Sequence, residues 1–363
     1  MTKKILLLGF TAAFISPLSS ASNQFQVFSQ FDAEIYTEAQ PVAAFVDDFD
    51  APLKSGDSAF TYNIFELGVS YSGFKFGFQS RYDYVLNFDP DTALYTHTEK
   101  NNLAFEDRFY TYRLDGKQAT TNGVFLSYDF NFLQNNSLTI TPKVSVFAST
   151  HFQDASVNGQ VFSDELEGSI LVDYSFSKDI LFKKFTPENN PKGMGYSFDL
   201  FVDWQVGNDF KVGLSIKDLF YKTDYDNSGY VRGQTTDVPF SKDDNGNVVT
   251  QPLVSLQTSA FGNTQNRDLE MITRFRVFAD YRISERYSTQ LTIKNYDKDT
   301  FNQLKGRIHF WDHWAVQAGF ETKSEAFLIG VESKYFGLNL KTDNLDLDKA
   351  YYANVNCYLN INF

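Results

Sequence analysis

The sequence has very little cysteine and no long apolar run. Cys357 is the only cysteine among 363 residues, so no intramolecular disulfide can form. Mean hydropathy is −0.33, and beyond the N-terminal region no stretch approaches the roughly 18 consecutive apolar residues of a membrane-spanning helix. The chain is therefore neither a disulfide-stabilised domain nor a helical membrane protein.

Aromatic residues, in contrast, are abundant. The chain contains 38 phenylalanines and 21 tyrosines, and aromatic residues make up 17% of the sequence. Strands that face lipid, with aromatic girdles at both membrane interfaces, use such a composition. The alternative is an aromatic-rich soluble β-sandwich.

The first residues have the order of a secretory signal peptide. Lys3 and Lys4 precede an apolar run over 5–15, and small residues follow up to Ala21. This run is too short to span a bilayer, and we expect cleavage after Ala21. Residues 1–21 are thus a predicted export signal, and 22–363 a single predicted domain.

The last thirteen residues alternate between an apolar and an amide-rich face. Tyr351, Leu359, Ile361 and Phe363 share the apolar face with Cys357, which we interpret as a small lipid-facing residue. A strand of this kind that ends on phenylalanine is typical of the closing strand of an outer-membrane β-barrel. We therefore expect these residues to form the assembly signal that the barrel-assembly machinery reads.

Segments of period two recur along the whole mature chain. The clearest are 74–84 and the pair 196–206 and 210–217, which a tight turn joins. We predict an all-β, transmembrane, antiparallel up-and-down barrel of 14 to 16 strands, because bacterial barrels use even numbers. Short turns near residues 72, 208, 284, 312 and 335 are expected at the periplasmic end. The long stretches 37–59, 86–102, 177–195 and 221–267 are expected outside the cell.

Residues 103–163 do not fit this scheme. The short turn at 134–136 and a long connection at 149–163 fall on the wrong sides of the membrane. A miscounted strand in this region is the expected error.

Charged residues on the inward face predict the chemistry of the lumen. The predicted inward set comprises Lys75, Arg81, Asp83, Lys143, Asp199, Asp203, Lys211, Lys217, Arg274, Arg276, Asp280, Arg282, Lys294, Lys305 and Arg307, together with acids such as Glu66, Asp129, Glu165, Glu167, Asp173, Glu270 and Glu321. The two signs nearly balance. Either opposite charges pair across a narrow or closed lumen, or they form a transverse field that selects small solutes.

Five apolar residues also fall on the inward face: Phe125, Leu171, Phe201, Ile272 and Phe278. They form a possible apolar path through a polar wall. Alternatively, they lie at a rim or a bulge, where the alternation breaks down.

The net charge of −13 is concentrated in the long loops. Acidic loops could bind divalent cations shared with lipopolysaccharide, although a solvated loop surface explains them equally. Residues 243–247 look like a calcium loop, but Ser241 occupies a ligand position, and we interpret the segment as a turn. The chain has no basic stripe, which excludes nucleic acid as a partner. The expected partners are outer-membrane lipid and lipopolysaccharide.

The sequence contains no motif for a catalytic nucleophile. Only His97 and His151 could serve a hydrolase at the barrel rim, whereas His309 and His313 flank a tight turn with Trp311 and Trp314 as interface anchors. We expect no catalytic activity, cofactor or metal site.

Barrel-hairpin patterns recur in the second half of the chain, within residues 193–363, at 193–200, 212–219, 278–282, 311–314 and 317–320. In these segments the chain resembles the superfamily of long-chain fatty-acid transporters and of conjugation- and secretion-associated barrels. The resemblance implies an outer-membrane barrel. Transporters of that superfamily carry an N-terminal plug, whereas 22–24 here lead directly into an alternating segment, so no ligand-binding residue is transferred.

Three classes of function follow from the sequence. The first is a porin-like channel or transporter for small or hydrophobic compounds in a Gram-negative outer membrane. The second is a structural or accessory barrel of a surface or secretion apparatus, and the third is an outer-membrane hydrolase. Neither the cargo nor the oligomeric state can be derived from the sequence.

Overall fold

A computed structural model describes residues 25–133, 135, 137–162, 167–181, 191–235, 241–242, 245–250, 254–258, 263–310 and 313–363. The predicted signal peptide lies outside the described residues. So do Glu165, Trp311, Asp312, the side chain of Glu167 and part of the calcium-like segment.

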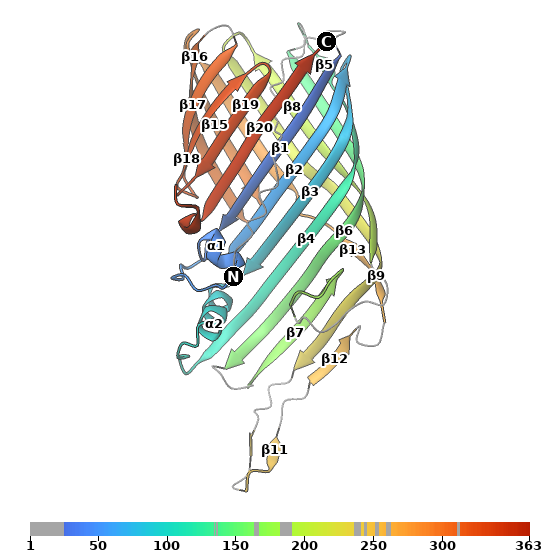
Figure 1. The fold of residues 1–363 in the computed structure, drawn as a ribbon, viewed down its shortest axis with the longest axis vertical. Helices are drawn as coiled ribbons and strands as arrows, with labels where there is room; N and C mark the ends of the chain where they lie inside the picture. Colours follow the sequence, from blue (N-terminus) through green and yellow to red (C-terminus); the bar gives the residue numbers. More distant parts are fainter. Residues whose placement is uncertain are drawn as a thin grey trace, which may run out of the picture.

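The strands form one closed antiparallel barrel (Figure 1). Fourteen strand positions make up its wall, within the predicted range. In order around the wall, and closing back on the first, they are β1 (Gln26–Thr37), β2 (Ser58–Tyr71), β3 (Phe74–Phe88), β4 (Phe109–Tyr128), β6 (Leu138–Phe162), β8 (Lys192–Val206), β9 (Phe210–Thr235), β14 (Arg274–Arg282), β15 (Tyr287–Tyr296), β16 (Asp299–Phe310), β17 (Trp314–Glu321), β18 (Ala326–Ser333), β19 (Phe336–Thr342) and β20 (Tyr352–Asn362).

Most of the remaining elements extend or cover this wall. The remaining elements are the strands β5 (Phe130–Phe132), β7 (Glu167–Phe176), β10 (Ser241–Lys242), β11 (Val248–Thr250), β12 (Val254–Thr258) and β13 (Gln265–Leu269), the helices α1 (Val42–Val46) and α2 (Pro90–Lys100), and the short 3-10 helix η2 (Leu347–Lys349). Of these, β10 and β11 form a separate two-stranded sheet. β7 pairs with the C-terminal part of β6, residues 153–162, whereas β8 pairs with its N-terminal part, residues 138–149. In the same way β12, β13 and β14 follow one another along β9.

The first and last strands close the barrel. β1 pairs with β20 without a register shift from Gln26 opposite Asn362 to Tyr36 opposite Tyr352. The backbone N–H of Phe363 donates to the carbonyl of Phe25 at 2.9 Å, and their rings lie 6.0 Å apart. Both chain ends of the barrel domain therefore lie at one end of the barrel.

That end also carries the short turns. Ser72 and Gly73 join β2 to β3 with φ of 48° and 85°, the left-handed conformation that a two-residue hairpin needs. Gly207 serves the turn between β8 and β9 with φ of 67°. We call this the short-turn end and the opposite one the long-loop end.

Residues 103–163 are where the strand prediction was wrong. The stretch 149–162 is not a connection, because β6 continues through it to Phe162 and pairs with β4 and β7. An extra residue, Thr150, lies between Ser149 and His151 and shifts the register there. This bulge reverses the alternation, which explains why one long strand looked like a strand followed by a loop.

The barrel is taller on one side than on the other (Figure 1). In the long-strand half, β2 to β9, the strands β6 and β9 have 25 and 26 residues. In the short-strand half, β14 to β20, the strands β18 and β19 have 8 and 7. The predicted outer loop 221–267 is corrected accordingly, since β9 runs on to Thr235 and β12 and β13 pair with it.

The outside of the wall is apolar on both halves. The side chains that share this face and are at least one third exposed include Leu67, Val69, Phe76, Phe78, Val124, Leu126, Val144, Val146, Tyr196, Val277, Leu291, Ile293, Leu304, Val316, Ile329, Leu340, Leu359 and Ile361. On β9 this face ends at Lys222, which pairs with Asp224 and Asp268 at 2.9 and 3.0 Å. An apolar belt with a charged border is the exterior of a membrane-spanning barrel. No helix among the described residues is long and apolar enough to cross a membrane.

Helix α2 protects an open strand edge at the long-loop end. Asp89 caps it by accepting from the backbone N–H of Thr92 at 2.8 Å. The Thr92 hydroxyl then accepts from the N–H of Arg113 at 2.8 Å, where β4 extends beyond β3. The helix thus satisfies a backbone group that would otherwise be exposed for pairing with another chain.

Candidate functional site: the barrel interior

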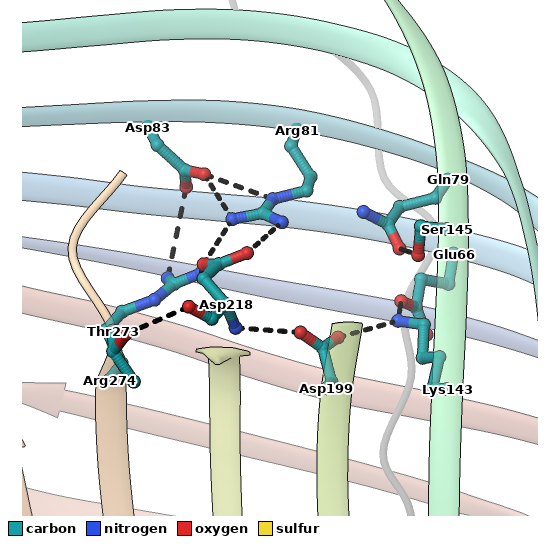
Figure 2. Close-up of polar contacts among 10 residues, drawn as sticks. All are labelled: Glu66, Gln79, Arg81, Asp83, Lys143, Ser145, Asp199, Asp218, Thr273 and Arg274. Carbon is teal, nitrogen blue, oxygen red and sulfur yellow. Dashed lines mark hydrogen bonds and ion pairs between the residues drawn. The ribbon is translucent and has the colours of Figure 1, made fainter. Parts of the chain in front are cut away.

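Charged side chains from strands that are not neighbours meet at the centre of the lumen (Figure 2). Arg81 on β3 donates from both terminal nitrogens to the carboxylate of Asp218 on β9, at 2.7 Å each. Arg81 also binds Asp83, and Arg274 on β14 binds Asp218 at 2.6 Å. These contacts cross the lumen and hold opposite parts of the wall together.

Asp218 occupies an unusual backbone position. Its φ of 58° is left-handed, which aspartate tolerates better than most residues. Its N–H donates to Asp199 at 2.8 Å, and its carbonyl accepts from the hydroxyl of Thr273 at 2.9 Å. The pairing of β8 with β9 shifts register beside Asp199. Asp218 is therefore the centre of a bulge that is fixed through both its backbone and its side chain.

A second crossing connects β2 and β6. The ammonium of Lys143 binds Glu66 and lies 3.6 Å from Asp199 (Figure 2). Nearby, the hydroxyl of Ser145 donates to Gln79 at 3.2 Å. Both ionic side chains of the crossing are at most 7% exposed, so this level of the lumen is filled by protein atoms.

The short-strand half contributes a separate ionic cluster. Lys294 on β15 lies 2.5 Å from Glu34 on β1 and 3.2 Å from Glu321 on β17. Lys341 on β19 binds Glu321 at 2.7 Å, and the hydroxyl of Tyr296 donates to Glu34 at 2.9 Å. Glu34 thus accepts from groups on the far side of the lumen.

Aromatic rings line the lumen towards the long-loop end. The buried residues that pack together there are Tyr36, Phe60, Tyr62, Val85, Ala119, Phe147, Phe152, Tyr221, Tyr225, Leu269, Met271, Phe301, Ala326 and Tyr352; we call them the aromatic cluster. The rings of Phe152 and Tyr225 stack at 3.8 Å, and those of Phe60 and Tyr62 at 5.1 Å. The guanidinium of Arg274 lies 4.1 Å from the ring of Tyr62, which joins the cluster to the central ion pairs.

The wall beside this cluster is interrupted. The strand that follows β9 stops pairing at Leu269, opposite Thr223, and resumes at Arg274, opposite Lys217. Residues 270–273 between these points belong to no strand. Met271, in this segment, is buried in the aromatic cluster, and Ile272 packs against it.

The predicted apolar path does not form one continuous surface. Phe125 is 3% exposed and lies beneath the ammonium of Lys143, at 4.7 Å. Phe278 lies below Lys211 and Arg276, and Ile272 packs on the aromatic cluster. Leu171 is 56% exposed on β7 and takes no part, so its place on the path was wrong. Phe201 pairs with Ser215 on β9, nearer the short-turn end.

The remaining predicted lumen residues differ in their partners. Lys75 binds Asp129, Lys211 binds Asp203 and Arg307 binds Asp280. Asp173 instead joins Arg232 and Arg267 in the extension of the long-strand half. Within the described residues, the side chains of Lys217, Arg276, Arg282 and Lys305 have no ion pair.

Sequence reasoning missed three central participants: Glu34, Asp218 and most of the aromatic cluster. The alternation in β1 placed Glu34 on the inward face, so it could have been found. Asp218 lies at a bulge, where the alternation does not predict whether a side chain points into the lumen or outward. The tyrosines and phenylalanines of the cluster come from β1, β2, β6, β9, β16 and β20, whose proximity depends on the closed barrel.

The histidines do not form a catalytic constellation. His97 on α2 contacts the carbonyl of Ala51 at 3.1 Å. His151 lies 2.9 Å from the hydroxyl of Ser177, but that hydroxyl already bonds the backbone of Phe152. His309 contacts Ser288 at 3.0 Å. Within the described part of the chain, none of these three imidazoles pairs with a carboxylate, and no group of metal ligands is found there.

The fold and the apolar exterior define a membrane-spanning β-barrel of the outer-membrane class. No protein-family model and no curated protein matches the chain. Among solved structures it is similar to the Ralstonia pickettii toluene transporter TbuX, with 10% identity, 94% of this chain and 89% of that chain covered, and a TM-score of 0.43.

Two further solved structures are similar over most of the chain. The TodX deltaS2S3 mutant monoaromatic hydrocarbon channel has 9% identity, 94% and 91% coverage and a TM-score of 0.43. A Pseudomonas aeruginosa FadL homologue has 9% identity, 93% and 87% coverage and a TM-score of 0.21. Identities near 10% and TM-scores below 0.5 assign the chain to no family.

Proposed function

We propose that the chain is exported to the outer membrane of a Gram-negative bacterium, loses residues 1–21, and there conducts small hydrophobic compounds. The barrel-assembly machinery inserts it, and lipopolysaccharide surrounds its long-loop end. The observation that carries the proposal is the aromatic cluster, a ring-lined layer inside a membrane barrel whose lumen is otherwise polar.

Ring faces and edges bind apolar solutes of similar shape, and an aromatic pair contributes about 0.5–1.5 kcal/mol beyond burial. A compound the size of one ring can replace a ring–ring contact in this layer. Residues 270–273 lack ladder bonds to β9, and this segment is held there by the bond from the Thr273 hydroxyl to the carbonyl of Asp218, so we take it as the part of the wall beside the cluster that can move. The solute therefore enters from the long-loop end and remains among apolar side chains.

The test is uptake of radiolabelled toluene by cells that carry the barrel. Phe60→Trp enlarges a side chain in the aromatic cluster, where Phe60 is 4% exposed, and should lower uptake. Phe78→Trp makes the same change on the lipid-facing side, where Phe78 is 43% exposed, and should leave uptake unchanged. Uptake equal to that of cells without the barrel would overturn the proposal.

A second candidate is a structural or accessory barrel without transport. The cross-lumen contacts of Arg81, Lys143 and Lys294 favour it, because they fill the interior with paired side chains. Such a barrel shows neither toluene uptake nor single-channel steps in a planar bilayer, and it copurifies with periplasmic or surface proteins. The hydrolase class has no supporting observation.

A further inference from the structure

Two buried hydroxyl groups on β9 lack hydrogen-bond partners within the described part of the chain. They belong to Tyr221 and Thr223, which are 6% and 0% exposed. The two hydroxyls lie close to each other but without the geometry of a hydrogen bond. In contrast, the hydroxyl of Tyr225, two residues further along, donates to Ser149 at 2.6 Å. A buried hydroxyl without a partner costs free energy, so the retention of two side by side needs an explanation.

Aromatic rings lie next to these hydroxyls. The rings of Tyr221 and of Phe147 on β6 are 5.2 Å apart. A Cβ atom at Gly195 on β8 would lie 2.6 Å from both the Phe147 ring and the Thr223 hydroxyl. The glycine therefore lets ring and hydroxyl approach the β8 backbone together, which gives the glycine-containing segment 193–200 a role in shaping the aromatic cluster.

The hydroxyls also lie beside the interrupted wall. The pairing of Leu269 with Thr223 is the last before the interruption, and on β9 Tyr221 falls within it. Leu269 and Met271 are buried in the aromatic cluster on the other side of this gap in the ladder. A solute among these residues meets apolar side chains and two hydroxyls at once.

We infer that this part of the aromatic cluster binds a single-ring phenol, with its ring on Phe147 and its hydroxyl between those of Tyr221 and Thr223. A phenolic hydroxyl donates one hydrogen bond and accepts others, so it supplies a partner to both protein hydroxyls. Its ring gains the edge and face contacts that the cluster offers. The inference rests on the proposed function, because a solute finds room here when the cluster opens to conduct it. It narrows the substrate class to aromatic compounds that carry a hydroxyl.

Binding can be measured by fluorine NMR on the purified full-length barrel in detergent. The probes are para-fluorophenol and para-fluorotoluene, which differ by a hydroxyl against a methyl group, and micelles without protein correct for partition. A purely apolar site favours para-fluorotoluene, because the phenol would lose its hydrogen bonds to water there. We expect the opposite order, with para-fluorophenol bound more tightly by the wild type.

Matched variants locate the site. Thr223→Val and Tyr221→Phe each remove one hydroxyl with little change of shape, and each should weaken the binding of para-fluorophenol about tenfold. Tyr358→Phe on β20 is the control. Tyr358 is 2% exposed, but its hydroxyl already donates to the carbonyl of Ser333 near the short-turn end. This variant should keep the wild-type preference.

Unfolding temperatures without ligand provide a second readout. Thr223→Val and Tyr221→Phe should unfold no lower than the wild type, because each removes an unpartnered buried hydroxyl, whereas Tyr358→Phe should unfold lower. A loss of phenol binding in the first two variants is then not a loss of the fold.

Two results would overturn the inference: tighter binding of para-fluorotoluene by the wild type, or a phenol preference that survives in both Thr223→Val and Tyr221→Phe. Toluene uptake by cells is measured separately. Uptake without a phenol preference removes this inference alone, whereas a barrel that binds neither probe and takes up no toluene contradicts the proposed function as well.

Discussion

The two halves of the barrel differ in how regularly their strands pair. In the short-strand half, β14 to β20, consecutive hairpins pair without a register shift. In the long-strand half the ladder shifts at Thr120/Thr121 and beside Asp199, and Asp218 has a left-handed φ. In the short-strand half the side chains therefore alternate regularly between the lumen and the outside. In the long-strand half the register shifts change which side chains point inward.

The irregularities coincide with the features that a function needs. The bulge at Asp218 lies beside the interrupted wall at 270–273 and under the aromatic cluster. Bulges of this kind re-aim side chains, and strained positions persist where the surrounding contacts fix them. Arg81, Arg274 and Asp199 provide those contacts.

The largest expected effect is on the free energy of unfolding. It is tested by removing one buried carboxylate from each half, Asp218 or Glu321. Asp218→Ala leaves two arginines short of a partner, which costs about 3–5 kcal/mol, and adds about 1 kcal/mol for alanine at a left-handed φ. Glu321→Ala likewise leaves Lys294 and Lys341 short of a partner but has no such backbone cost. We expect Asp218→Ala to lower the free energy of unfolding more, as measured by guanidinium titration in detergent.

Asp218→Asn separates the two contributions, because asparagine tolerates the left-handed conformation but carries no charge. It should lose less stability than Asp218→Ala. Equal losses in Asp218→Ala and Glu321→Ala would show that the bulge is not fixed by this residue.

The next effect concerns conductance. Removing the crossing between β2 and β6 with Glu66→Ala and Lys143→Ala together should raise the single-channel conductance severalfold, because two side chains leave the centre of the lumen. The control removes Lys75 and Asp129, which pair at 3.0 Å near the short-turn end without crossing the lumen. If both double variants conduct equally, the crossing does not limit the passage of ions.

The sequence predicts the regular parts of this barrel and not the irregular ones. The alternation over 74–84 locates β3, and that of 196–217 locates most of β8 and β9 with the turn at Gly207. The sequence did not predict the C-terminal part of β6, because the extra residue Thr150 inverts the alternation there. The pairing of Arg81 with Asp218 could not be predicted either, since it depends on which strands face each other across the closed barrel.

A third prediction tests the seam that joins the two halves. Deleting Phe363 removes the ring that packs on Phe25. It also removes the hydrogen bond from the backbone N–H of Phe363 to the carbonyl of Phe25. We expect a sharply lower yield of protein that resists SDS without heating, because the last strand directs closure and assembly. The control is the substitution Phe363→Tyr, which keeps an aromatic ring at this position and should preserve the yield. A normal yield of the deletion variant would place the assembly signal elsewhere in β20.

The smallest effect concerns the covered edge of the long-strand half. Arg108 hydrogen-bonds Asp91 on α2 at 2.9 and 3.0 Å, and these bonds lower the pKa of the carboxyl. Since the folded-state pKa is lowered, the stabilisation is present above the ordinary aspartate pKa of about 3.9 and is lost as the pH falls through the lowered value.

Asp91 also accepts from the N–H of Thr111, so hydrogen exchange at that amide reports on the contact. Corrected for its intrinsic rate, exchange there should accelerate below about pH 4 while the barrel remains folded, as expected for a part-exposed pair worth under about 1 kcal/mol. Asp91→Asn should exchange faster at pH 6 and lose the pH dependence. The short-strand half offers a reference, because the paired amides of β17 should show no such step.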